Sequence, residues 1–181
     1  MKSTEDLMNE HRIIERMLDI LAKACDRLEG GDFASSEAFA HAADFFKNFA
    51  DLCHHGKEEK KLFQKMVARG MSAEVGPIAV MLHEHEDGRA HVRAMGKLSE
   101  KKLDDYARDE LMRHSREYVD LLRQHIQKED NILYPIADKI LTEADQKELE
   151  QGFEEIETKV MGPGVHERYH KMIEAWEEKY A

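Results

Sequence analysis

Hydrophobic residues recur along most of this chain at intervals of three and four, the period of an amphipathic α-helix. Between residues 4 and 28 the pattern is carried by Leu7, Ile14, Met17, Leu18, Leu21 and Leu28, and Gly30-Gly31 ends it. Similar patterns predict helices over residues 35–68, 77–98 and 105–140, the last with a kink near Pro135. Because the connections are short, we expect these four helices to form an all-α, up-down four-helix bundle.

Residues 141–181 predict a helical extension. Thr142 and Asp145 form a capping-box start for a helix that ends at Gly162-Pro163-Gly164, and an amphipathic segment follows from Val165. We therefore divide the chain into a bundle of residues 1–140 and an extension of residues 141–181. The extension is expected to pack on the bundle or on a partner subunit in a homodimer.

Composition narrows the class of protein. With 41% hydrophobic and 36% charged residues and only three Pro, the chain favours one helical domain. Its net charge of -11 argues against a nucleic-acid partner, and no apolar run is long enough to span a membrane. The charged N-terminus and the two separated cysteines favour a cytoplasmic protein with reduced thiols.

One motif occurs twice in the sequence. His54 and Glu58 precede Leu62-Phe63, and His125 and Glu129 precede Leu133-Tyr134 at the same spacing. Four residues apart on a helix, a His and a Glu share one face. His55 and Glu59 offer an alternative register, and the hydrophobic period does not decide between the two. Superposing the two copies places His55 over Ile126, so we favour His54 and Glu58 and expect His55, His83 and His91 at the surface.

Two further histidines, His11 and His85, lie one on each of the other helices. Four imidazoles and two carboxylates suit two metal ions, and bundles are known to build such sites from inward-facing side chains. Thiolate-free ligands allow Fe, Mn or Zn, of which a redox-active iron pair is our preferred interpretation. The predicted metal ligands are His11, His54, Glu58, His85, His125 and Glu129.

Segments around each ligand, including Asn9-Glu10-His11 and His125 to Pro135, together resemble the hemerythrin-like, or HHE cation-binding, family over about residues 5–140. The resemblance implies terminal iron ligation by the four histidines. It also implies that Glu58 and Glu129 bridge two irons, with an oxo or hydroxo bridge between the metals.

The departures from this family bear on function. Oxygen-carrying members have a second His four residues after the ligand on the third helix, where this chain has Arg89. A fifth imidazole is then missing, and Gly88 leaves space for a small ligand or water, which argues against simple reversible oxygen carriage. We expect a di-iron protein that binds, senses or reacts with dioxygen, peroxide or nitric oxide. Peroxidase-like, catalase-like and nitric oxide-handling activities stay open, the electron donor is unknown, and the alternative is an iron-buffering or metal-binding module without turnover.

Other residues carry open alternatives. Tyr118 and His114 share the helical face of His125. They either line a channel or exchange protons with the metal site, or they are ordinary core residues. Glu15 either orients His11 or is a surface charge, and Cys53 is expected to be a buried thiol. His166, Glu167 and His170 match the H-E-x-x-H pattern of zinc proteases, but no obvious third ligand follows, so we favour an amphipathic tail.

Overall fold

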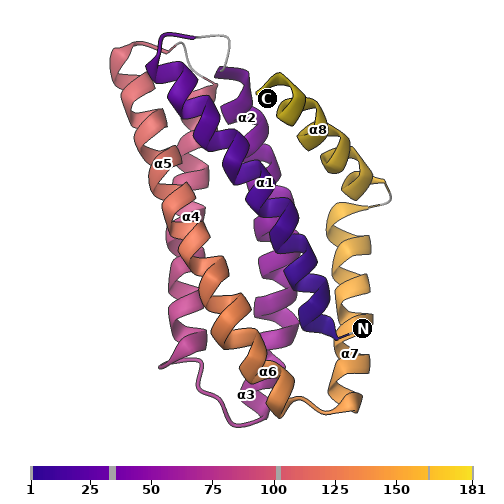
Figure 1. Ribbon diagram of the computed structural model, residues 1–181. Coiled ribbons are helices and arrows are strands. Elements are labelled where there is room, and N and C mark those ends of the chain that lie inside the picture. The colour runs from indigo at the N-terminus through magenta and orange to yellow at the C-terminus, as the bar shows by residue number, and fades with distance from the viewer. Residues whose placement is uncertain (1, 33–35, 101–102, 163, 181) are drawn as a thin grey trace.

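The computed structural model describes residues 2–32, 36–100, 103–162 and 164–180, which form only helices, turns and short connections (Figure 1). The predicted first helix is α1 (Ser3–Glu29), and the third is α4 (Pro77–Ser99). The second is a continuous helical stretch built from α2 (Ser36–Phe45), η2 (Phe46–His55), η3 (Glu58–Leu62) and α3 (Phe63–Ala68). The fourth comprises α5 (Asp105–Lys128), η4 (Glu129–Leu133) and α6 (Tyr134–Ile140). The expected start at Ser35 lies outside the described residues.

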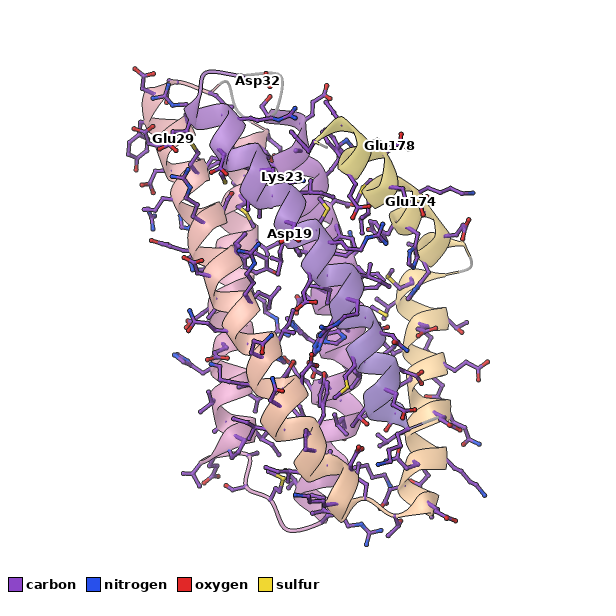
Figure 2. The ribbon with its side chains drawn as sticks, viewed as in Figure 1. Asp19, Lys23, Glu29, Asp32, Glu174 and Glu178 are labelled. Carbon is purple, nitrogen blue, oxygen red and sulfur yellow. The ribbon has the colours of Figure 1, made fainter. Side chains whose placement is uncertain are left out.

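The four long helices form a closed ring of neighbours. Helix α1 packs between α2 and α5, and α4 completes the ring by packing against the same two helices. Polar side chains such as Asp19, Lys23 and Glu29 point outward from α1 (Figure 2). This is the all-α four-helix bundle that the sequence predicts.

The C-terminal segment lies along the outside of this ring (Figure 1). It consists of α7 (Glu143–Ile156), η5 (Glu157–Met161) and α8 (Val165–Lys179). Helix α7 contacts α1 and η3, η5 contacts η2, and α8 contacts α1. The predicted capping box is present, because Thr142 Oγ1 accepts from the Asp145 backbone N–H at 3.2 Å. Arg69 donates to the same Asp145 side chain at 2.8 Å and thereby ties α7 to the end of the second helical stretch.

Three segments of the bundle have π-helical hydrogen bonding, in which each N–H donates five residues back: η2, η3 and η4. Such segments are rare and frequently occur at functional sites. The sequence predicts a kink near Pro135, and the structure has the π-helical turn η4 directly before it, with Pro135 in the first turn of α6. Proline has no N–H to donate to the preceding turn, and the wider π-helical turn lies directly before the position where that hydrogen bond is missing.

Two apolar clusters fill the bundle, one above and one below a polar layer. The larger lies beyond His11 along α1 and includes Ile14, Met17, Phe46 and Leu122. The smaller includes Leu7, Leu62, Met81 and Leu133. Between them lie buried histidines and glutamates together with Lys57, so every long helix changes from apolar to polar and back at the same level. No helix in the described ranges is long and apolar enough to cross a membrane.

Candidate metal centre

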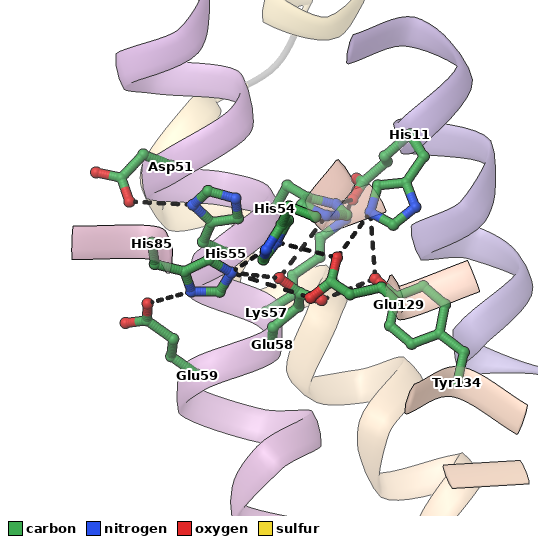
Figure 3. A network of polar contacts seen from close by, with 12 residues as sticks. His11, Asp51, His54, His55, Lys57, Glu58, Glu59, His85, Glu129 and Tyr134 are labelled. Atoms are coloured by element: carbon green, nitrogen blue, oxygen red, sulfur yellow. Dashed lines mark hydrogen bonds and ion pairs between the residues drawn. The ribbon is translucent and has the colours of Figure 1, made fainter. Parts of the chain in front are cut away.

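Seven buried side chains meet in the polar layer, and none is more than 4% exposed. Helix α1 supplies one, η2 two, η3 one, α4 one, α5 one and η4 one (Figure 3). They are His11, His54, His55, Glu58, His85, His125 and Glu129. All six residues predicted from the sequence are therefore brought together, and His55 joins them. Together these seven residues form the centre.

The centre divides into two groups of potential ligands. His55, Glu58, His85 and His125 each offer an atom within 4.8 Å of the others, and so do His11, His54 and Glu129. The groups adjoin, because Glu129 Oε2 lies 3.2 Å from His125 Nε2 and Glu129 Oε1 lies 4.0 Å from His85 Nε2. One group thus has three imidazoles and the other two, with one carboxylate in each.

Each imidazole has its Nδ1 atom next to a carboxylate. The Nδ1···O distances are 2.7 Å from His11 to Asp130, 2.8 Å from His54 to Glu10, 2.7 Å from His85 to Glu59 and 3.0 Å from His125 to Glu84. His55 Nδ1 lies 3.5 Å from Asp51, close enough for an ion pair and long for a hydrogen bond. A carboxylate on Nδ1 fixes the tautomer that leaves Nε2 free, which is the usual arrangement for a metal-binding histidine.

A ring of cations holds these carboxylates in turn. Lys57 Nζ donates to Glu10 at 2.6 Å, Lys128 pairs with Glu84, and Arg12 pairs with Asp130. Arg89 serves two of them, donating to Asp51 at 2.7 Å and to Glu59 at 2.8 Å. Arg89 therefore does not enter the centre. Its role is to hold the two carboxylates beside His55 and His85.

The electrostatics of the two central carboxylates differ. Burial raises the pKa of Glu58 well above its ordinary value, and the nearby Glu129 raises it further. The pKa of Glu129 falls well below its ordinary value, because His125 and His11 outweigh its burial. Tyr134 donates its hydroxyl hydrogen to Glu58 Oε1 at 2.7 Å, and burial raises the pKa of this phenol, so it remains a donor.

Several polar atoms of the centre are buried with no hydrogen-bond partner: His54 Nε2, Glu58 Oε2 and both carboxylate oxygens of Glu129. Leaving such atoms unpaired in a protein interior is costly. Imidazole nitrogens and carboxylate oxygens are ligands for iron, manganese and zinc, so bound metal would satisfy these atoms. The donor set and its unpaired atoms therefore fit a dinuclear metal site.

One sequence-based expectation about this region was wrong. His55 is not at the surface: it is 4% exposed, and its ring stacks on His85 with centroids 3.8 Å apart. A fifth imidazole is thus present, supplied by η2 instead of α4. Gly88 does border open space, as expected, because it lines a cavity of about 560 Å³ that reaches His55, although a Cβ atom at Gly88 would lie 3.3 Å from Tyr118 Cε2.

The π-helical hydrogen bonding of η2 explains why the register comparison failed for His55. Superposing the two motif copies assumes the same α-helical geometry in both, but η2 contains His54 and His55 whereas His125 lies in the α-helical α5. The wider turn brings two consecutive histidines inward. Glu59, the partner of His55 in the alternative register, lies outside the centre and holds His85.

The sequence interpretation also missed the outer carboxylates, although a signal exists. Glu10, Glu59, Glu84 and Asp130 each directly adjoin a residue of the centre in the sequence. Each contacts a histidine on a helix other than its own: Glu10 contacts His54, and Asp130 contacts His11. Acidic residues beside the motif residues could have suggested this ring, but not which histidine each one holds.

The remaining candidates lie outside the centre. Tyr118 is a core residue, 2% exposed and packed edge-on against Phe46. It also lines a surface cavity of about 560 Å³ that reaches His55. Glu15 pairs with Arg12 and not with His11. Burial raises the pKa of Cys53 to about 12, as expected for a buried thiol.

The H-E-x-x-H motif forms no recognisable zinc-protease site. Within the described residues, His166 can meet Glu10 and Cys53, but no group of three or more potential ligands contains both His166 and His170. The two histidines lie on α8, whose apolar face packs on the bundle through Tyr169 and Ile173. This segment is therefore an amphipathic terminal helix.

Comparison with known proteins agrees with the geometry. The family described as the hemerythrin HHE cation binding domain matches residues 2–137. An uncharacterized protein of Mycobacterium tuberculosis is 24% identical over 160 residues, which cover 87% of this chain and 62% of the relative. An iron-sulfur cluster repair protein, YtfE, of Pectobacterium atrosepticum is 26% identical over 134 residues, covering 71% of this chain and 60% of the relative. The chain thus spans about three fifths of the length of these curated relatives.

Proposed function

The chain belongs to the hemerythrin HHE cation-binding family, and from this premise we propose that the centre holds two iron ions and binds a small diatomic ligand or peroxide. Dioxygen, peroxide and nitric oxide are the candidate ligands. The observation that carries the proposal is the unequal division of five imidazoles, three in one group and two in the other. The metal with fewer protein ligands has more room for an added ligand.

In this proposal His55, His85 and His125 hold one metal, and His11 and His54 hold the other. Glu58 and Glu129 lie between the groups and are the candidate bridging carboxylates. Bound iron would supply the redox chemistry and the open coordination position. The protein holds the imidazoles through their Nδ1 carboxylates, and an apolar cluster lies on each side of the centre.

Tyr134 has a distinct place in this proposal. Its hydroxyl oxygen lies 2.7 Å from Glu58 Oε1 and 3.4 Å from His11 Nε2, on the side of the two-imidazole group. A protonated phenol at this position can donate a hydrogen bond to a carboxylate or to a ligand with a negatively charged oxygen. Reversible dioxygen binding is also compatible with this ligand set. The sequence had argued against it because a fifth imidazole was missing, and His55 supplies one.

The test is reconstitution of the full chain with ferrous iron, followed by metal analysis and near-ultraviolet spectra with each candidate ligand. We expect about two irons per chain and a spectral change with at least one of the three ligands. His54→Ala and His55→Ala should both lose iron. His83→Ala is the matched control, because His83 is an exposed histidine of α4 that pairs with Asp87 outside the centre.

Two outcomes would change the assignment. Full iron content in the His55→Ala variant would remove His55 from the ligand set and restore the six-ligand interpretation. Iron binding without a response to dioxygen, peroxide or nitric oxide would instead favour the iron-buffering alternative.

A further inference from the structure

A second group of potential ligands lies between α4 and α5, away from the centre. His91 and His114 face each other with their Nδ1 atoms 3.1 Å apart, and Glu117 Oε2 lies 3.7 Å from His91 Nδ1. All three offer atoms within 4.8 Å of one another. His91 is six residues beyond His85 on α4, which places it about 9 Å farther along the helix axis. The group is therefore separate from the centre.

We propose that His91, His114 and Glu117 form a mononuclear site for a divalent transition metal, with zinc as the best match. Two imidazole nitrogens bound to one tetrahedral zinc ion, each at about 2.05 Å, lie about 3.3 Å apart. The observed separation of 3.1 Å needs only a small adjustment. Nitrogen and oxygen donors without thiolate suit zinc, nickel and copper, whereas calcium and magnesium prefer oxygen alone.

The protein surroundings allow an ion to enter. The side chains of His91 and His114 are 20% and 21% exposed, and that of Glu117 is 47% exposed, so the site opens to solvent. Burial and the adjoining His114 lower the pKa of His91, so this imidazole is neutral near pH 7 and available as a ligand. Three protein ligands leave a fourth tetrahedral position for water.

Arg113 competes with a metal at this site. Its guanidinium donates to Glu117 Oε2 at 2.8 Å and lies 3.1 Å from His114 Nε2. An imidazole that binds metal through Nδ1 carries its hydrogen on Nε2, which then faces the Arg113 donor. Metal binding therefore requires Arg113 to turn away, and its 46% exposure with a second partner in Glu110 gives it room to do so.

The same contact distinguishes this proposal from a plain hydrogen bond between two histidines. In the metal-free chain, donation from Arg113 to Nε2 would leave the His114 hydrogen on Nδ1, where it can bond to His91. Removing Arg113 would weaken that arrangement. If the group binds metal, however, removing Arg113 frees Glu117 and relieves the conflict at Nε2.

The experiment is a zinc titration of the full chain against a chromophoric chelator. We expect His91→Ala and His114→Ala each to bind one zinc ion fewer than the wild type, and Arg113→Gln to bind zinc more tightly. His83→Ala is again the control, because it removes an exposed α4 histidine outside the group. Circular dichroism checks that the variants fold.

The His54→Ala variant separates this proposal from the proposed function. It alters the centre and leaves the second group intact, so the zinc that depends on His91 should still bind, whatever the centre holds. Equal zinc binding by wild type, His91→Ala and His114→Ala would overturn the proposal. An unchanged or lower zinc affinity in Arg113→Gln would also overturn it.

Discussion

Lys57 is a buried lysine that joins the centre to the C-terminal segment. Its side chain is 1% exposed, and its ammonium group donates to Glu10 at 2.6 Å and also pairs with Glu157 of η5. Glu10 in turn holds His54 Nδ1 at 2.8 Å. A Lys57→Met variant keeps much of the length of the side chain and removes only the cation, so it tests this chain of contacts directly.

The expected loss of stability follows from what remains around Glu10. Removing one partner of a buried ion pair costs about 3–5 kcal/mol, because the other charge stays buried without compensation. Glu10 retains its contact with His54, so we expect the lower end, about 3 kcal/mol. Urea unfolding of the metal-free chain measures this value, provided that the denaturant dependence is the same for both proteins.

The matched control is Glu157→Gln. In Glu157→Gln the Lys57 ammonium keeps Glu10 at 2.6 Å, and the partner it loses is 43% exposed, so this change should cost less than about 1 kcal/mol. A loss below about 1 kcal/mol in Lys57→Met would refute the reasoning. Equal losses in the two variants would also refute it, because the buried Glu10 would then not be the source of the cost.

The Lys57→Met variant should also change how the stability of the fold depends on pH. Burial would raise the pKa of Glu10, but the hydrogen bond with His54 and the charge of Lys57 lower it to about 2. Because the folded pKa lies below the ordinary value of 4.5, Glu10 stabilises the fold above pH 4.5, and this contribution is lost as pH falls toward 2. Without Lys57 the folded pKa of Glu10 moves back toward 4.5, so Lys57→Met should lose less stability than the wild type as pH falls from 4.5 toward 2.

Three further predictions concern the surroundings of the centre. Arg89→His should lower iron content instead of adding a ligand, because Asp51 and Glu59 lose their shared cation; metal analysis decides. Tyr134→Phe should cost the metal-free chain about 1–2 kcal/mol in urea unfolding, since Glu58 Oε1 loses its donor. Hydrogen bonds from Thr142 hold the pKa of Asp145 at about 2, below its ordinary 3.8. Asp145→Asn should therefore lower the melting temperature at pH 7, and the difference from wild type should shrink as pH falls toward 2.

The sequence allowed the helices and their order to be predicted because each helix has a strong apolar period and a clear end. Gly30-Gly31 follows α1, Pro77 begins α4, and the Thr142 capping box begins α7. These are local signals, and each depends on residues only a few positions apart. The positions at which the centre is built could be predicted for the same reason, since a His and a Glu four residues apart share a helical face.

Contacts between helices could not be predicted in this way. Asp130 lies 119 residues from His11, and Glu84 lies 41 residues from His125. Both acids are common on charge-rich helices, and only the packing of the helices shows which imidazole each one reaches. The π-helical hydrogen bonding of η2 was likewise not indicated by the sequence. It places the His55 side chain in the centre, where the sequence had predicted a surface position.

Arg89 is linked to the fifth imidazole, His55, through the carboxylate of Asp51. At position 89 of α4 a histidine could be a ligand, but the guanidinium there instead reaches Asp51, beside His55, and Glu59, beside His85. The residue that seemed to remove an imidazole from α4 thus holds the carboxylate next to the imidazole that η2 supplies. Because one arginine holds the partners of two adjacent, stacked histidines, the orientations of His55 and His85 are coupled. The number of ligands in such a bundle therefore follows from where the side chains point and not from matching helix positions.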